Sequence, residues 1–130
     1  MFENLEIFSM ANALARHSAS RQSVVAENIA NADTPGYRAR DAASFAASYE
    51  TGPGQGLTAT RPGHVFAGEA EYSAEAKAVY RPGAASPNGN NVSIEQEMFA
   101  AAEAAGDHQK ALAIYRSALT VLRTSLSGGK

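Results

Sequence analysis

The sequence predicts a mainly α-helical protein in which long N- and C-terminal helices form a coiled-coil-like pair, with a small irregular middle lobe of short strands. Three observations lead to this prediction. All five Pro lie between Pro35 and Pro87, so both ends of the chain lack this helix breaker. Apolar residues recur at heptad spacing in both ends, whereas the middle is rich in Gly, Pro, Ser and Ala. We therefore expect three segments: an N-terminal helix with its stop (1–37), a middle lobe (38–92) and a C-terminal heptad helix (93–130).

The N-terminal helix is expected to begin at Phe2 or Ser9 and to end at Ala30. Its apolar and polar heptad positions are Ile7, Met10, Leu14, Val24 or Val25, and Asn28. His17 and Arg21 interrupt this pattern. Polar residues inside an apolar heptad pattern fix register and choice of partner at a cost in stability, so this helix is interpreted as one built for a specified assembly.

The stretch NIANADTPGY contains the expected helix stop. Asn tolerates left-handed backbone geometry, so Asn31 is expected to end the helix in that conformation. Pro35 and Gly36 suit the two central positions of a type II turn. A plain helix stop does not account for Asn28 and Tyr37, which we interpret as candidates for contacts with the loop or with a neighbouring chain.

The middle segment offers little material for an independent core. Short runs at 57–60, 64–67 and 77–81 have the composition of brief strands, and turn residues such as Arg-Pro-Gly flank them. Large apolar residues are few, and Ala supplies about half of the 45% of residues that are hydrophobic. We expect a small lobe that becomes ordered against partners.

The C-terminal helix carries the clearest pattern in the chain. Its predicted apolar stripe consists of Ile94, Met98, Ala101, Ala105, His108, Leu112, Tyr115, Leu119, Leu122 and Leu126. A second stripe of Ala111, Ile114, Ala118 and Val121 widens the apolar face. Ser93 and Gln96 are predicted to form a capping box at the start. Glu95 and Glu97, in the first turn, are interpreted as carboxylates that serve capping and the helix dipole.

Composition argues against several classes of function. The net charge of -2 and the absence of a basic patch argue against nucleic-acid binding. There is no Cys, no His spacing typical of a metal site, no nucleophile motif and no phosphate-binding loop. The start of the chain has acidic residues in place of a basic signal-peptide region, and no stretch has transmembrane length. We therefore expect no enzyme activity, cofactor, metal or small-molecule substrate.

The His residues leave one alternative open. If the two long helices pair antiparallel with Asn31 opposite Ile94, then His17 lies opposite His108. Two facing imidazoles can bind a metal ion or respond to pH. The interpretation that we favour is a polar layer within the helix pair, or side chains that reach neighbouring subunits.

Two runs resemble a known family. The run that ends at Tyr37 resembles the N-terminal signature of bacterial flagellar rod and hook proteins, which is approximately A-x-N-[IL]-A-N-x-x-T-P-G-[YF]. The matching residues, which the resemblance marks as assembly residues, are Asn28, Ile29, Ala30, Asn31, Thr34, Pro35, Gly36 and Tyr37. The run Gly89-Asn90-Asn91-Val92, with Glu97 behind it, resembles the GN-x-V-x-x-x-x-E run of the B-type proximal rod proteins. The C-type proximal rod proteins, which usually have Pro-Asn-Val at this point, are the nearest rival.

The resemblance implies a structural subunit of the flagellar basal-body rod, which transmits torque from motor to hook. It also implies export by the flagellar type III apparatus without a cleaved signal peptide, followed by assembly in the periplasm. The implied partners are further copies of the chain, other rod proteins, the rod-base adaptor protein, and membrane-ring and export-gate proteins. The alternatives from other classes are a small cytoplasmic helical binding or chaperone-like protein and a His-based metal module.

Overall fold

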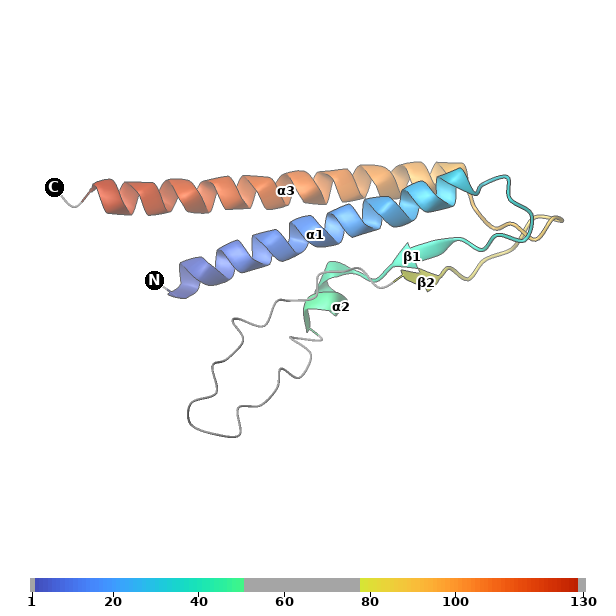
Figure 1. Cartoon of the computed structure of the whole chain (residues 1–130), viewed down its shortest axis with the longest axis horizontal. Coiled ribbons are helices and arrows are strands. Elements are labelled where there is room, and N and C mark those ends of the chain that lie inside the picture. The colour runs from blue at the N-terminus through green and yellow to red at the C-terminus, as the bar shows by residue number, and fades with distance from the viewer. Residues whose placement is uncertain (1, 51–77, 129–130) are drawn as a thin grey trace, which may run out of the picture.

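A computed structural model describes residues 2–50 and 78–128 of the chain. Two long helices, α1 (Phe2–Ala30) and α3 (Ile94–Ser127), lie side by side and antiparallel, so that both ends of the chain lie at the same end of the pair (Figure 1). We call this the open end and the opposite one, where the connecting segments lie, the loop end. The predicted mainly α fold with a small strand-containing middle is confirmed.

Small residues line the contact between the helices. On α3 the buried residues are Glu97, Ala104 and Ala111, one heptad apart, and we call them the inner stripe. Facing residues of α1 include Ala11, Ser18 and Val25, which are 3%, 1% and 5% exposed. Because Ala and Ser let two backbones approach closely, the pair is tight, but each residue buries little apolar area.

The predicted apolar stripe of α3 faces α1 only in part. Ala101, His108 and Leu122 are half-buried near the inner stripe. The large residues Ile94, Met98, Leu112 and Leu126 are 54%, 63%, 40% and 81% exposed, and we call them the outer stripe. Tyr115 is also 43% exposed, although its ring packs edge-on against Phe8. Heptad spacing alone could not choose between these neighbouring stripes, and the Ala-lined one permits the closer helix approach.

The register that sets Asn31 opposite Ile94 agrees with the contacts at the loop end. Asn28 of α1 hydrogen-bonds Glu97 of α3. Farther along the pair, Arg21 binds Glu103 at 2.8 Å. The polar positions of α1 thus form specific contacts across the pair.

The middle segment adds a small sheet against α1. Strand β1 (Arg40–Ala42) pairs antiparallel with β2 (Ala78–Tyr80), with Asp41 opposite Val79, and helix α2 (Phe45–Glu50) follows β1. The predicted strand at 77–81 corresponds to β2, whereas β1 and α2 were not predicted. The runs at 57–60 and 64–67 lie outside the described residues.

Candidate functional site

The helix stop uses a different device from the one predicted. Among the described residues, only Gly36 and Gly89 have a positive φ, so the left-handed conformation predicted for Asn31 is wrong. The side chain of Asn31 instead donates to the carbonyl of Glu27 at 2.8 Å. The Thr34 N–H donates to the Asn31 carbonyl at 3.0 Å, so the chain leaves α1 through successive tight turns. Gly36, and not Asn31, is therefore the residue that adopts the left-handed conformation.

The turn predicted at Pro35 and Gly36 is confirmed. The N–H of Tyr37 donates to the carbonyl of Thr34 at 3.2 Å, and Gly36 has a φ of 74°. Gly89, with a φ of 83°, packs against this turn. A Cβ atom at Gly89 would lie 3.3 Å from the Cα of Gly36, which is tighter than ordinary van der Waals contact. The two signature runs thus meet through their glycines.

Asn90 ties the second run to the end of α1. Its Nδ2 group lies 3.0, 2.8 and 2.9 Å from the carbonyl oxygens of Asn31, Ala32 and Thr34. Its Oδ1 atom accepts a hydrogen bond from the N–H of Val92 at 2.8 Å. The side chain is 4% exposed, so it satisfies carbonyls that the end of α1 leaves without helical partners.

The residues on either side of Asn90 make further bonds to neighbouring segments. The N–H of Gly36 donates to the carbonyl of Asn88 at 2.9 Å. Asn91 accepts from the N–H of Ala39 at 2.6 Å and donates to the carbonyl of Arg81 at 3.1 Å. The segments before α3 and after α1 are therefore held together by both backbone–backbone and side chain–backbone bonds.

Asn28 lies at the centre of the loop end. Its Nδ2 donates to the Arg40 carbonyl at 2.7 Å and to Glu97 Oε2 at 3.0 Å. Its Oδ1 accepts from the Arg40 N–H at 3.0 Å and from the Tyr37 hydroxyl at 3.3 Å. Asn28 is 0% exposed, so of the two contacts proposed for it, the one with the loop is present within the chain. Any effect of Asn28 on a neighbouring chain must pass through the loop that it holds.

Tyr37 is half-buried beside this amide. Burial raises the pKa of its phenol above the ordinary 10.0, and the negative charge of Glu27 adds to the shift. The phenol thus keeps the proton that it donates to Asn28.

Glu97 is the residue whose role sequence analysis missed. It is 0% exposed, and its Oε1 atom lies 2.7 Å from Nη1 of Arg81, which also lies 3.7 Å from Asp41 through Nε. Its carboxylate therefore joins α3, α1 and the end of β2. The signal was available in the second signature run, in which this Glu follows the Asn pair, but a place in the first turn of a helix favoured the interpretation as a capping residue.

The remaining predicted residues lie around this core. Ser93 occupies the N-cap position of α3 with extended backbone, but its side chain makes no capping bond, so the predicted capping box with Gln96 is not formed. Its carbonyl accepts the N–H of Glu97 at 3.0 Å, and the buried Glu97 carboxylate, not the cap, anchors this end of the helix. Ile29 and Pro35 are exposed, and Ala30 ends α1.

The His pair does not form a recognisable metal site. His17 Nε2 lies 2.7 Å from the Ala43 carbonyl, and its ring packs edge-on against Phe45. His108 Nδ1 is buried without a hydrogen-bond partner among the described residues. The same part of the chain holds no group of three or more His, Asp or Glu arranged to bind a metal, and none of its helices is long and apolar enough to cross a membrane.

Comparison with known proteins adds to this geometry. Residues 10–38 match the family described as "Flagella basal body rod protein". The chain is 38% identical over 121 residues to "Flagellar basal body rod protein FlgB" of Salmonella typhimurium, covering 85% of this chain and 86% of that protein. It is 34% identical to the proteins of the same name from Cereibacter sphaeroides, with 84% of each chain covered, and from Escherichia coli, with 85% and 86% covered.

Proposed function

The chain belongs to the FlgB family of flagellar basal body rod proteins, and we propose that it assembles into the proximal rod through the outer stripe of α3. A structural subunit of this kind needs a fixed shape and surfaces that recognise neighbours. The interlocked loop end supplies the first, and the outer stripe of α3 supplies the second.

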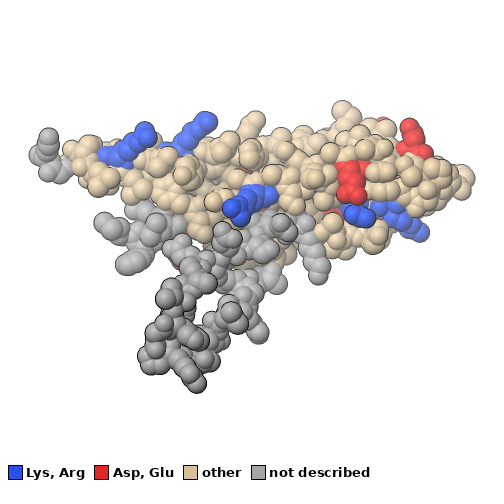
Figure 2. Space-filling model, viewed as in Figure 1, with Lys and Arg blue, Asp and Glu red and all other residues tan. Residues whose placement is uncertain are grey.

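The observation that carries this proposal is the exposure of large apolar residues on α3. Met98 is 63% exposed and Leu126 81% exposed, and the outer stripe runs along the whole helix. The face shown in Figure 2 is mostly tan, with Lys and Arg side chains at several points along its length and Asp and Glu side chains toward the loop end. Large apolar residues exposed at intervals along one helix are typical of a surface that binds another protein.

Ion pairs lie on the other flank of the helix. Glu103 binds Arg21 at 2.8 Å, and Lys110 binds Asp107 at 3.1 Å. At 100° per residue, Glu103 lies about half a turn around the helix from Leu112. These two ion pairs thus lie on a different flank of α3 from Leu112, although exposed apolar residues such as Val121, which is 58% exposed, also occur on their flank.

The proposal also covers how the chain is exported and which proteins it contacts. We propose export by the flagellar type III apparatus without signal cleavage, because a helix pair with an Ala-lined contact holds little apolar burial to oppose unfolding. We propose that the rod segment lies in the periplasm, with contacts to other rod proteins, the rod-base adaptor, and membrane-ring and export-gate proteins.

The experiment complements a strain that lacks the gene for this protein with Met98→Glu. Because Met98 is exposed, the change should alter the free energy of unfolding by less than about 0.5 kcal/mol. A buried charge at a subunit interface should nevertheless abolish swimming and rods in isolated basal bodies.

The matched control is Ser117→Glu, which adds the same charge at an exposed position about 100° around α3 from Met98. It should swim as the unmodified protein does. Normal swimming of the Met98→Glu strain, with the variant present in its basal bodies, would exclude the outer stripe as an interface.

A further inference from the structure

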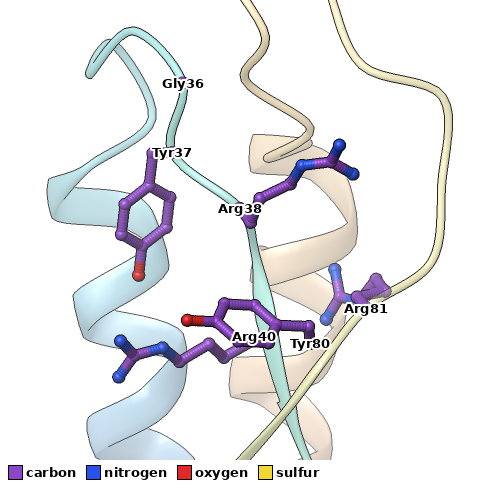
Figure 3. Close-up of a pocket in the computed structure, with 6 residues that line it drawn as sticks. All are labelled: Gly36, Tyr37, Arg38, Arg40, Tyr80 and Arg81. Atoms are coloured by element: carbon purple, nitrogen blue, oxygen red, sulfur yellow. The ribbon is translucent and has the colours of Figure 1, made fainter.

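The loop end also contains a recess that the network described above does not fill. It has a volume of about 440 Å³ and is lined by Gly36, Tyr37, Arg38, Arg40, Tyr80 and Arg81. Figure 3 shows the six residues that line the recess: the two phenol rings lie on the side of α1, the Arg38 side chain extends away from them, and Arg40 extends toward α1. The recess is large enough for a side chain with part of its backbone, and too small for a helix.

The charged side chains that line the recess are all positive. Three guanidinium groups and two phenols line the recess, and no carboxylate does. Arg81 is paired with Glu97 and Asp41, and Arg40 lies 3.3 Å from Glu27. Among the described residues, Arg38 makes no ion pair, and it is exposed. The recess therefore carries a surplus of one positive charge.

The aromatic residues indicate which chemical groups, besides a negative charge, a ligand of this recess would carry. Tyr80 is 66% exposed, with the Arg40 guanidinium 5.7 Å from the centre of its ring. A Cβ built on Gly36 would meet no atom within 4 Å, so the turn leaves the recess open. An apolar stem beside a single carboxylate matches an open phenol face beside an unpaired guanidinium.

We propose that this recess binds one acidic side chain, Asp or Glu, of a neighbouring protein chain in the rod. The proposal rests on the proposed function for its source of ligand, but its chemistry stands on the recess alone. One surplus charge fits one carboxylate and not a polyanion. Arg38 supplies the ion pair, and Tyr80 supplies the apolar wall.

The test uses two capped peptides that differ only in one residue, Ala-Ala-Glu-Ala-Ala and Ala-Ala-Gln-Ala-Ala, titrated into the full-length 15N-labelled protein at low salt. The Glu peptide should shift the amide signals of Gly36, Arg38 and Tyr80, and these shifts should shrink when NaCl is raised, because salt screens an exposed ion pair. The Gln peptide should bind at least about fivefold more weakly, as expected for loss of one ion pair of about 1 kcal/mol. Equal shifts from both peptides, or none from either, would overturn the proposal.

Variants locate the binding and separate it from assembly. Arg38→Glu should abolish the shifts and Arg38→Lys should keep them, while Arg123→Glu, an equal charge reversal at an exposed position near the open end, should leave them unchanged. Binding that survives Arg38→Glu would refute the site. Because the titration uses the single chain, it remains decisive whether or not the Met98→Glu strain forms rods.

Discussion

The two ends of the helix pair are stabilised in different ways. At the loop end, fully buried Asn28 and Glu97 are bonded to residues far away in the sequence. Along the rest of the pair, α1 and α3 meet mainly through Ala and Ser, and large apolar residues remain exposed on α3. The loop end thus holds its shape through directed polar bonds, whereas α3 keeps large apolar side chains exposed along its whole length, from Ile94 to Leu126.

This difference separates two tasks that the family signature alone does not distinguish. The signature residues around Asn28 and Asn90 maintain the fold of one chain. The outer stripe, which carries no such signature, is the surface that we propose for contacts with neighbours. The strongest way to test the comparison is to remove a side chain from each region and measure the stability of the isolated chain.

The largest effect is expected from Glu97→Ala. The change leaves Arg81, whose side chain is only 20% exposed, without its closest partner and deprives the Asn28 amide of an acceptor. Breaking one side of a buried pair should lower the free energy of unfolding by about 3–5 kcal/mol. Urea unfolding followed by far-UV circular dichroism measures this loss.

Glu103→Ala is the matched control, because it breaks the other ion pair between α3 and a residue outside that helix. That pair is exposed, with side chains 23% and 67% accessible, so the loss should be at most about 1 kcal/mol. Similar losses for the two variants would show that the loop end is no better fixed than the rest of the pair.

The features that depend on periodicity and turn chemistry could be predicted from the sequence. Heptad spacing predicted both long helices, and the Pro-Gly pair predicted the turn at Gly36. Heptad spacing did not determine which stripe of α3 faces α1, because adjacent stripes share the same period. Only the packed pair shows which stripe allows the two helices to approach more closely.

The hydrogen-bond partners in the polar network could not be predicted from the sequence. The partners of Asn28, Asn90 and Glu97 are mostly backbone groups or side chains that become neighbours only when the chain folds back. Local rules therefore assigned Glu97 to the helix dipole and Asn31 to a left-handed cap. The signature runs did contain the right residues, but the runs give no indication that the two bind each other.

A smaller effect is expected where the two runs touch. Gly89→Ala places a Cβ 3.3 Å from the Cα of Gly36 and forces an L residue to a φ of 83°. The left-handed conformation alone costs about 1–2 kcal/mol, so the midpoint of urea unfolding should fall.

Gly106→Ala within α3 should change the free energy of unfolding in the opposite direction. A Cβ there meets no atom within 4 Å, and Ala is favoured over Gly in a helix interior by about 1 kcal/mol, so this variant should unfold at higher urea. Destabilisation by both substitutions would mean that the helices tolerate added volume as poorly as the loop end does.

The smallest effect concerns the protonation of Tyr37. Its phenol donates to Asn28 at 3.3 Å, and burial together with Glu27 raises its pKa in the folded chain above the unfolded value of 10.0. A raised folded pKa gives a contribution that is fully present below pH 10.0 and is lost as pH rises through the folded pKa. The free energy of unfolding, measured in urea across this range, should therefore fall more steeply with pH in the unmodified protein than in Tyr37→Phe. An unchanged slope in Tyr37→Phe would mean that this phenol is not fixed by the loop-end network, and the polar core would then end at Asn28.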